Sequence, residues 1–65
     1  MTPAEFKEAR RNLGLSAAQL AAVMGYGAAP RIYEIEAREA VPAQAARLMQ
    51  AYLDGYRPSD WPNAA

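Results

Sequence analysis

Arginines, carboxylates and tyrosines are the side chains of this 65-residue sequence that could do chemistry, because the chain contains no histidine and no cysteine. Without these two residue types, the commonest nucleophile–base pairs and zinc sites cannot be assembled. All but one of the seven basic residues are arginine, whose planar guanidinium suits bidentate recognition of phosphate or guanine better than the lysine ammonium does. These residue types favour binding over catalysis, and we expect neither a metal ion nor another cofactor.

The net charge of the chain is zero, with seven basic and seven acidic residues. A neutral chain lacks the strong attraction to phosphates that drives non-specific nucleic-acid binding. Neutrality does not exclude a nucleic-acid partner, because the distribution of charge matters more than its sum. A chain of this length forms one domain with a thin stability margin, and a homodimer is a common way to support so small a core.

Two capping boxes divide the first part of the chain into two helices. Thr2 is followed three residues later by a glutamate, and a proline occupies the first helical position, so a helix is predicted over Pro3–Leu13. Gly14 is expected to end it as a left-handed residue. Ser16 opens a second capping box, and Gly25 closes the short helix that follows.

Two further helices are predicted in the second half of the chain. Gly25–Ala28 forms a turn, and Pro30 is tolerated in the first turn of a helix over Ala29–Ala37. Pro42 begins the last helix, and Gly55 ends it. The inward face of that helix is predicted to contain Ala45, Leu48 or Met49, Tyr52 and Leu53.

A pair of short helices joined by a tight, glycine-containing turn is typical of the helix-turn-helix unit. This order of residues resembles the Cro and lambda-repressor-like (XRE-type) helix-turn-helix family. The resemblance covers about residues 4–53 and rests on the runs Gly14-Leu15-Ser16-x-x-x-Leu20-Ala21-x-x-Met24-Gly25-Tyr26 and Ile32-x-x-Ile35-Glu36. The chain departs from the family pattern at Ala17, where the family has glutamine, in a turn that is one residue longer, and at Arg38, where a glycine is usual.

The resemblance implies an all-α fold of four to five short helices. A helix-turn-helix domain would span residues 1–55, and a tail rich in aromatic residues and proline would span residues 56–65. Arg10 and Glu36 match a structural ion pair of the family, and the helix over Ala29–Ala37 would enter the DNA major groove. The residues expected to contact DNA are Ser16, Ala17, Ala28, Ala29, Arg31, Tyr33, Glu34 and Arg38.

These contacts are not equivalent, and each has a structural alternative. Arg31 is the first candidate for reading guanine, with a solvated or phosphate-binding arginine as the alternative. Tyr33 either contacts a thymine methyl group or packs on the last helix. Glu34 either accepts from cytosine or faces solvent. The free amides at Ser16 and Ala17 are suited to a phosphate.

Three aromatic side chains lie outside the predicted DNA surface. Tyr52, Tyr56 and Trp61 either cover the core of a small domain or form a dimer interface, where aromatic residues are enriched. The two roles are compatible, because a tail can pack on its own core and on a partner.

The predicted function is that of a dimeric DNA-binding repressor acting on a palindromic operator, as in small phage or mobile-element regulators. The alternative is an antitoxin-like or polymerase-binding module that uses the same helices without touching DNA. An enzyme is not expected, because the domain is too small for a walled pocket of several hundred Å3. No small-molecule ligand and no membrane contact are expected, and a cytoplasmic location follows from the lack of a long apolar run or a signal-peptide pattern.

Overall fold

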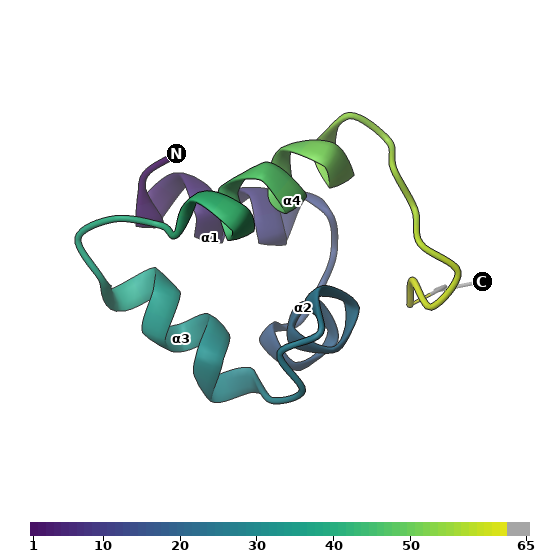
Figure 1. Ribbon diagram of the computed structural model, residues 1–65, viewed down its shortest axis with the longest axis horizontal. Helices are drawn as coiled ribbons and strands as arrows, with labels where there is room; N and C mark the ends of the chain where they lie inside the picture. Colours follow the sequence, from purple (N-terminus) through teal and green to yellow (C-terminus); the bar gives the residue numbers. More distant parts are fainter. Residues whose placement is uncertain (63–65) are drawn as a thin grey trace.

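The computed structural model describes residues 1–62 and contains four helices in that range. They are α1 (Pro3–Asn12), α2 (Ala17–Met24), α3 (Ala29–Ala37) and α4 (Ala43–Leu53). Helices α1 and α4 pack side by side, and α2 and α3 lie on the other side of the core, as Figure 1 shows. The tail leaves α4 and runs back toward α2 (Figure 1). The described part of the chain contains no strand, so the all-α prediction is confirmed.

Both predicted capping boxes are present. The Glu5 amide donates to Thr2 Oγ1 over 3.1 Å, and the Thr2 amide donates to Glu5 Oε1 over 2.7 Å. Ser16 and Gln19 form the equivalent pair of bonds at the start of α2, at 3.1 and 2.9 Å. Each box satisfies amides that have no partner within the helix, which is why the two helices begin where the sequence indicates.

The core lies where the four helices meet. Its largest fully buried side chains are Phe6, Leu20, Ile32, Ile35, Met49 and Tyr52. Each helix contributes at the spacing of three and four residues that is typical of an amphipathic helix. Ala21 is also fully buried in this cluster, and its small side chain allows α2 and α3 to approach closely.

The prediction that Leu53 faces inward is wrong. Its side chain is 42% exposed, whereas Ala45, Met49 and Tyr52 of the same helix are buried. Those three residues define one stripe along α4, and Leu53 lies beside that stripe, next to Met1 of the N-terminus. Of the two residues left open in the sequence analysis, Met49 is in the core, and Leu48 is partly exposed.

Burial of Tyr52 predicts a loss of stability at alkaline pH. Burial, reinforced by the negative charges that Tyr56 and Asp60 can carry, raises the pKa of Tyr52. Folding therefore favours the protonated phenol, and this stabilisation is present below the unfolded-state pKa of about 10 and is lost as the pH rises through the folded-state value. We expect the melting temperature of Tyr52→Phe to fall less between neutral and strongly alkaline pH than that of the wild type. Tyr33→Phe, at an exposed position, should follow the wild-type curve, and equal losses in all three proteins would contradict the role of Tyr52.

Candidate nucleic-acid interface

Helices α2 and α3 are joined by a turn that two left-handed glycines shape. Gly25 and Gly27 both have a φ of 84°, a conformation that side chains with a Cβ rarely adopt. The amides of Tyr26 and Gly27 donate to the Ala21 carbonyl oxygen over 2.8 and 3.3 Å, which closes the end of α2. The extra residue noted in the sequence is thus accommodated by a second left-handed position, and the helix-turn-helix arrangement is retained.

Arg10 and Glu36 form an ion pair that ties α1 to α3. Arg10 Nε donates to Glu36 Oε2 over 2.8 Å, and the two side chains are only 13% and 8% exposed. Arg10 Nη1 also donates to the Leu15 carbonyl oxygen over 3.1 Å, so the guanidinium holds the turn between α1 and α2 as well. The pair expected from the sequence is therefore present. Through Arg10 it joins α1, the turn between α1 and α2, and α3.

The outer face of α3 is open to solvent. Tyr33 is 58% exposed, and Ala28 and Glu34 are also exposed, whereas Ala29 is partly buried against the core. Pro30 and Ala37 share this outer face, although the sequence analysis did not single them out. The helical period could have found them, because residues 30, 33, 34 and 37 lie opposite the buried Ile32 and Ile35.

Arg31 is held by two neighbours in the free protein. Its guanidinium carbon lies 5.4 Å from the centroid of the Tyr26 ring, and its Nη1 lies 3.4 Å from Glu34 Oε1. The Arg31 side chain is 36% exposed and the Glu34 side chain is 57% exposed, so solvent weakens this ion pair.

The first turn of α2 offers main-chain groups only. Ser16 Oγ already accepts from the Gln19 amide, and the Ala17 side chain is 3% exposed and packs in the core. The Ser16 amide donates to Gln19 Oε1 over 2.9 Å, so the expectation of a free amide at Ser16 is wrong. The Ala17 amide remains an available donor at the positive end of the helix dipole.

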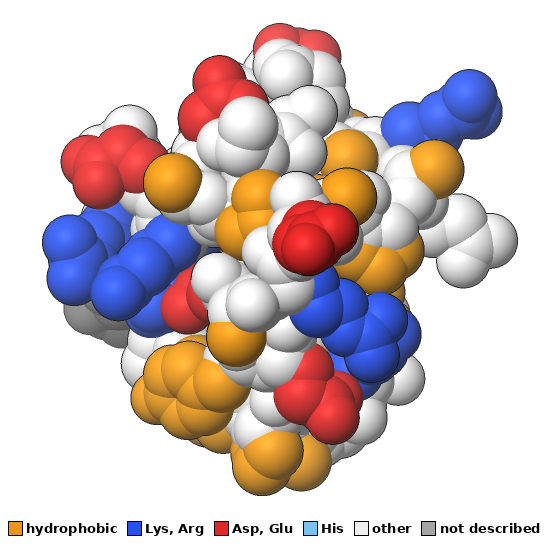
Figure 2. Space-filling view, turned by 90° about the vertical axis from the view of Figure 1, so that its left-hand side faces the viewer, with side chains coloured by type: hydrophobic (Ala, Val, Ile, Leu, Met, Phe, Trp, Pro, Cys, Tyr) orange, Lys and Arg blue, Asp and Glu red, His pale blue; other side chains and the backbone are white. Residues whose placement is uncertain are grey.

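The basic residues of the chain do not form one continuous surface. Arg38 is exposed as the C-cap residue just after α3, about 15 Å along the helix from Ala28. On the face that Figure 2 displays, the Lys and Arg side chains lie in separate groups with Asp and Glu side chains between them. The predicted contacts among residues 28–38 therefore lie at both ends and along one side of α3, and on the face shown in Figure 2 the positive charges are not concentrated.

Tyr52 of α4 packs against both aromatic side chains of the tail. The Tyr52 and Tyr56 rings are stacked, with centroids 6.2 Å apart, and Trp61 meets Tyr52 edge-on at 5.1 Å. Tyr52 is buried, Trp61 is partly buried against the core, and Tyr56 is exposed. The tail thus covers the core of its own chain. Residues 63–65 of the predicted tail domain lie outside the described residues.

Sequence reasoning missed Arg57, which organises the tail. Its Nη1 donates to the carbonyl oxygens of Tyr52 and Tyr56 over 2.7 and 2.9 Å, and its guanidinium carbon lies 4.3 Å from the Trp61 ring centroid. It therefore satisfies two carbonyl groups at the end of α4, where intrahelical partners are lacking. An arginine four residues before a tryptophan, just after a helix end, was the only available signal.

Comparisons with protein-family models, with curated proteins and with solved structures found no match. The described residues contain no cluster of acidic, histidine or cysteine side chains that could hold a metal ion. None of the four helices is long and apolar enough to cross a membrane. The geometry defines the protein as a small all-helical domain that contains a helix-turn-helix unit.

Proposed function

We propose that this protein is a sequence-specific DNA-binding transcriptional regulator of the cytoplasm, which represses transcription as a homodimer on a palindromic operator. The observation that carries the proposal is the open outer face of α3, presented by a helix-turn-helix unit that the buried Arg10–Glu36 pair braces. In such a unit the second helix enters the major groove and the first crosses the backbone. We do not propose an enzymatic activity.

Two features of the geometry support particular contacts. Pro30 has no amide hydrogen and the Arg31 amide donates to the Ala28 carbonyl oxygen, so the Ala29 amide is the main-chain donor left for a phosphate at the start of α3. Arg31 and Tyr33 reach outward from the next turn, where a guanine edge and a thymine methyl group are the matching base features. Because the domain offers few contacts, two copies on adjacent half-sites supply the affinity that one lacks.

One observation favours a protein partner as the second candidate. The outer face of α3 combines Pro30, Tyr33 and Ala37 with the acidic Glu34, and Arg31 is already paired with this glutamate. An apolar and aromatic surface of this kind also suits a protein interface, in which tyrosine is enriched. The same face would then neutralise a toxin or bind a polymerase subunit.

The experiment is an in vitro selection from a random DNA library at low salt, followed by anisotropy titrations of the enriched sequence. We expect an inverted repeat to be enriched. Arg31→Ala should lose about 1–3 kcal/mol of discrimination at one base pair per half-site while the fold is kept. Arg47→Ala, an exposed arginine on α4, is the matched control and should retain the discrimination.

Two results would contradict different parts of the proposal. If no sequence is enriched, and a folded protein at micromolar concentration fails to shift DNA at low salt, the DNA-binding function is wrong. Retained sequence preference in Arg31→Ala would instead reject only the assigned role of Arg31. Sedimentation of the selected complex, with two protein chains per repeat expected, tests the dimer.

A further inference from the structure

A hollow of about 650 Å3 lies between the turn that joins α1 to α2 and the C-terminal tail. Leu13 and Leu15 line it from the turn, and Arg57, Ser59 and Trp61 line it from the tail. Small-molecule sites in proteins have volumes of roughly 300–1,000 Å3, so this hollow is large enough for a ligand. The hollow is open to solvent, so it is not the walled pocket that an enzyme was expected to need.

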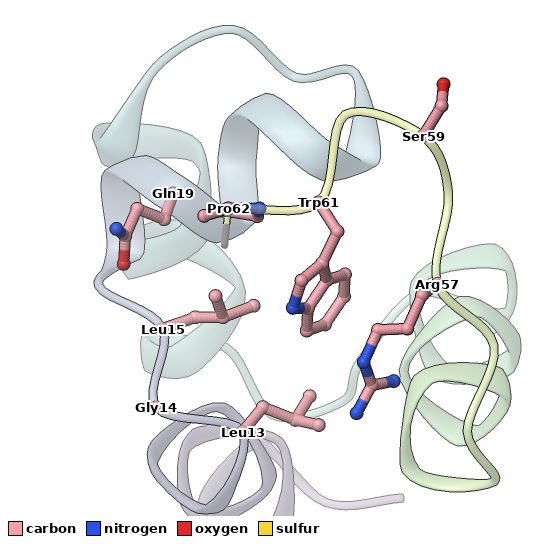
Figure 3. Close-up of a pocket in the computed structure, with 8 residues that line it drawn as sticks. All are labelled: Leu13, Gly14, Leu15, Gln19, Arg57, Ser59, Trp61 and Pro62. Atoms are coloured by element: carbon pink, nitrogen blue, oxygen red, sulfur yellow. The ribbon is translucent and has the colours of Figure 1, made fainter. Parts of the chain in front are cut away.

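The lining of the hollow is about equally polar and apolar, and it carries one positive charge. Figure 3 shows the Leu15 side chain, the Trp61 indole and the Arg57 guanidinium converging on the same space. Leu15 is buried, and Leu13 and Trp61 are partly buried against the core. A hydrophobic group would therefore find a preformed surface that is already partly shielded from water.

Among residues 1–62, the guanidinium of Arg57 is held in place and has no carboxylate partner. Its bonds to the Tyr52 and Tyr56 carbonyl oxygens use Nη1, and the Trp61 ring supports one side of it. Within residues 1–62 it forms no ion pair and no hydrogen bond through its other nitrogens. Because the side chain is already ordered, an anion that bound it would not have to offset the entropy of immobilising a long side chain.

We propose that this hollow is a binding site for a small organic carboxylate that carries an aromatic or aliphatic group. The carboxylate accepts hydrogen bonds from the unused Arg57 nitrogens, and the apolar group lies against Leu13, Leu15 and Trp61. A guanidinium matches the geometry of a carboxylate. The proposal is independent of DNA binding, and it departs from the expectation, drawn from the sequence, that no small molecule is bound.

The chain contains a single tryptophan, so its fluorescence reports on this site alone. We expect phenylacetate to change the Trp61 emission of the full chain in a saturable manner, with a Kd of about 1 mM, as is usual for a ligand of this size. Benzylamine and benzyl alcohol carry the same ring without the carboxylate. They should bind at least about tenfold more weakly, because a hydrogen bond to a charged partner is lost.

Two variants and a second measurement locate the site. Arg57→Gln should weaken phenylacetate binding about tenfold, and Arg47→Gln, an exposed arginine elsewhere, should leave it unchanged. In the wild type, amide chemical shifts on adding phenylacetate should change at Gly14 and Leu15. If the ligand-free emission shows that Arg57→Gln has released the tail, this variant is not informative. The comparison of the three ligands in the wild type then tests whether the site recognises the carboxylate. Absence of saturation, equal binding of benzylamine, or shift changes confined to other helices would each overturn the proposal.

Discussion

Replacement of Glu36 by glutamine will lower the melting temperature by more than about 10 °C. The exchange removes the carboxylate from a pair whose side chains are 13% and 8% exposed, and it leaves the Arg10 guanidinium uncompensated among α1, α3 and the α1–α2 turn. Breaking a buried ion pair from one side costs roughly 3–5 kcal/mol. In a domain of this size each 1 kcal/mol corresponds to roughly 4–8 °C, so thermal unfolding followed by circular dichroism will resolve the effect easily.

The control for this prediction is Glu39→Gln, which removes an exposed carboxylate just beyond α3 and should change stability by less than about 0.5 kcal/mol. The double variant Arg10→Met, Glu36→Leu should recover most of the loss, because it leaves no unpaired charge in the interior. If Glu36→Gln has the same melting temperature as the wild type but no longer binds DNA, Glu36 is a contact residue, and the structural role assigned to it is wrong.

Tyr52→Ala is the second change with a large expected effect. The side chain is 1% exposed, and both Tyr56 and Trp61 pack against its ring. Truncation of a buried aromatic residue to alanine costs about 3–5 kcal/mol, which is comparable with the whole stability of a domain this small. We expect a low melting temperature together with a red-shifted Trp61 emission, because the indole loses its neighbour and becomes wetter.

Tyr56→Ala is the matched control, since the stacked partner of Tyr52 is 56% exposed and should cost about 1 kcal/mol or less. Tyr52→Phe keeps the ring and should retain both the fold and the packed tail at neutral pH. Similar melting temperatures for Tyr52→Ala and Tyr56→Ala would show that the tail does not depend on the buried ring.

The contacts of Arg57 also hold the tail against its own chain. Arg57 joins the end of α4 to Trp61, so the tail is attached at both the Tyr52 ring and the helix terminus. A tail attached in this way covers the core of its own chain without a partner. Homodimerisation therefore remains a part of the proposed function that the sedimentation experiment must establish separately.

The amino-acid sequence by itself determined the helices and their ends. Thr2 with Glu5 and Ser16 with Gln19 set two starts, and left-handed Gly25 set one end, because capping depends on residues within one turn of each other. The Arg10–Glu36 pair was reached through the resemblance to helix-turn-helix proteins, since a pair that is 26 residues apart has no local signature.

Only the packing of the helices decided which side chains of each helix are buried. Periodicity defined a broad apolar arc on α4, and contact with α1 selected Met49 and excluded Leu53. The packing of the helices likewise buried the Ala17 methyl group and placed Trp61 against the core beside the hollow. These contacts depend on the angles and distances between helices, which arise from the summed fit of many side chains and not from any short run of residues.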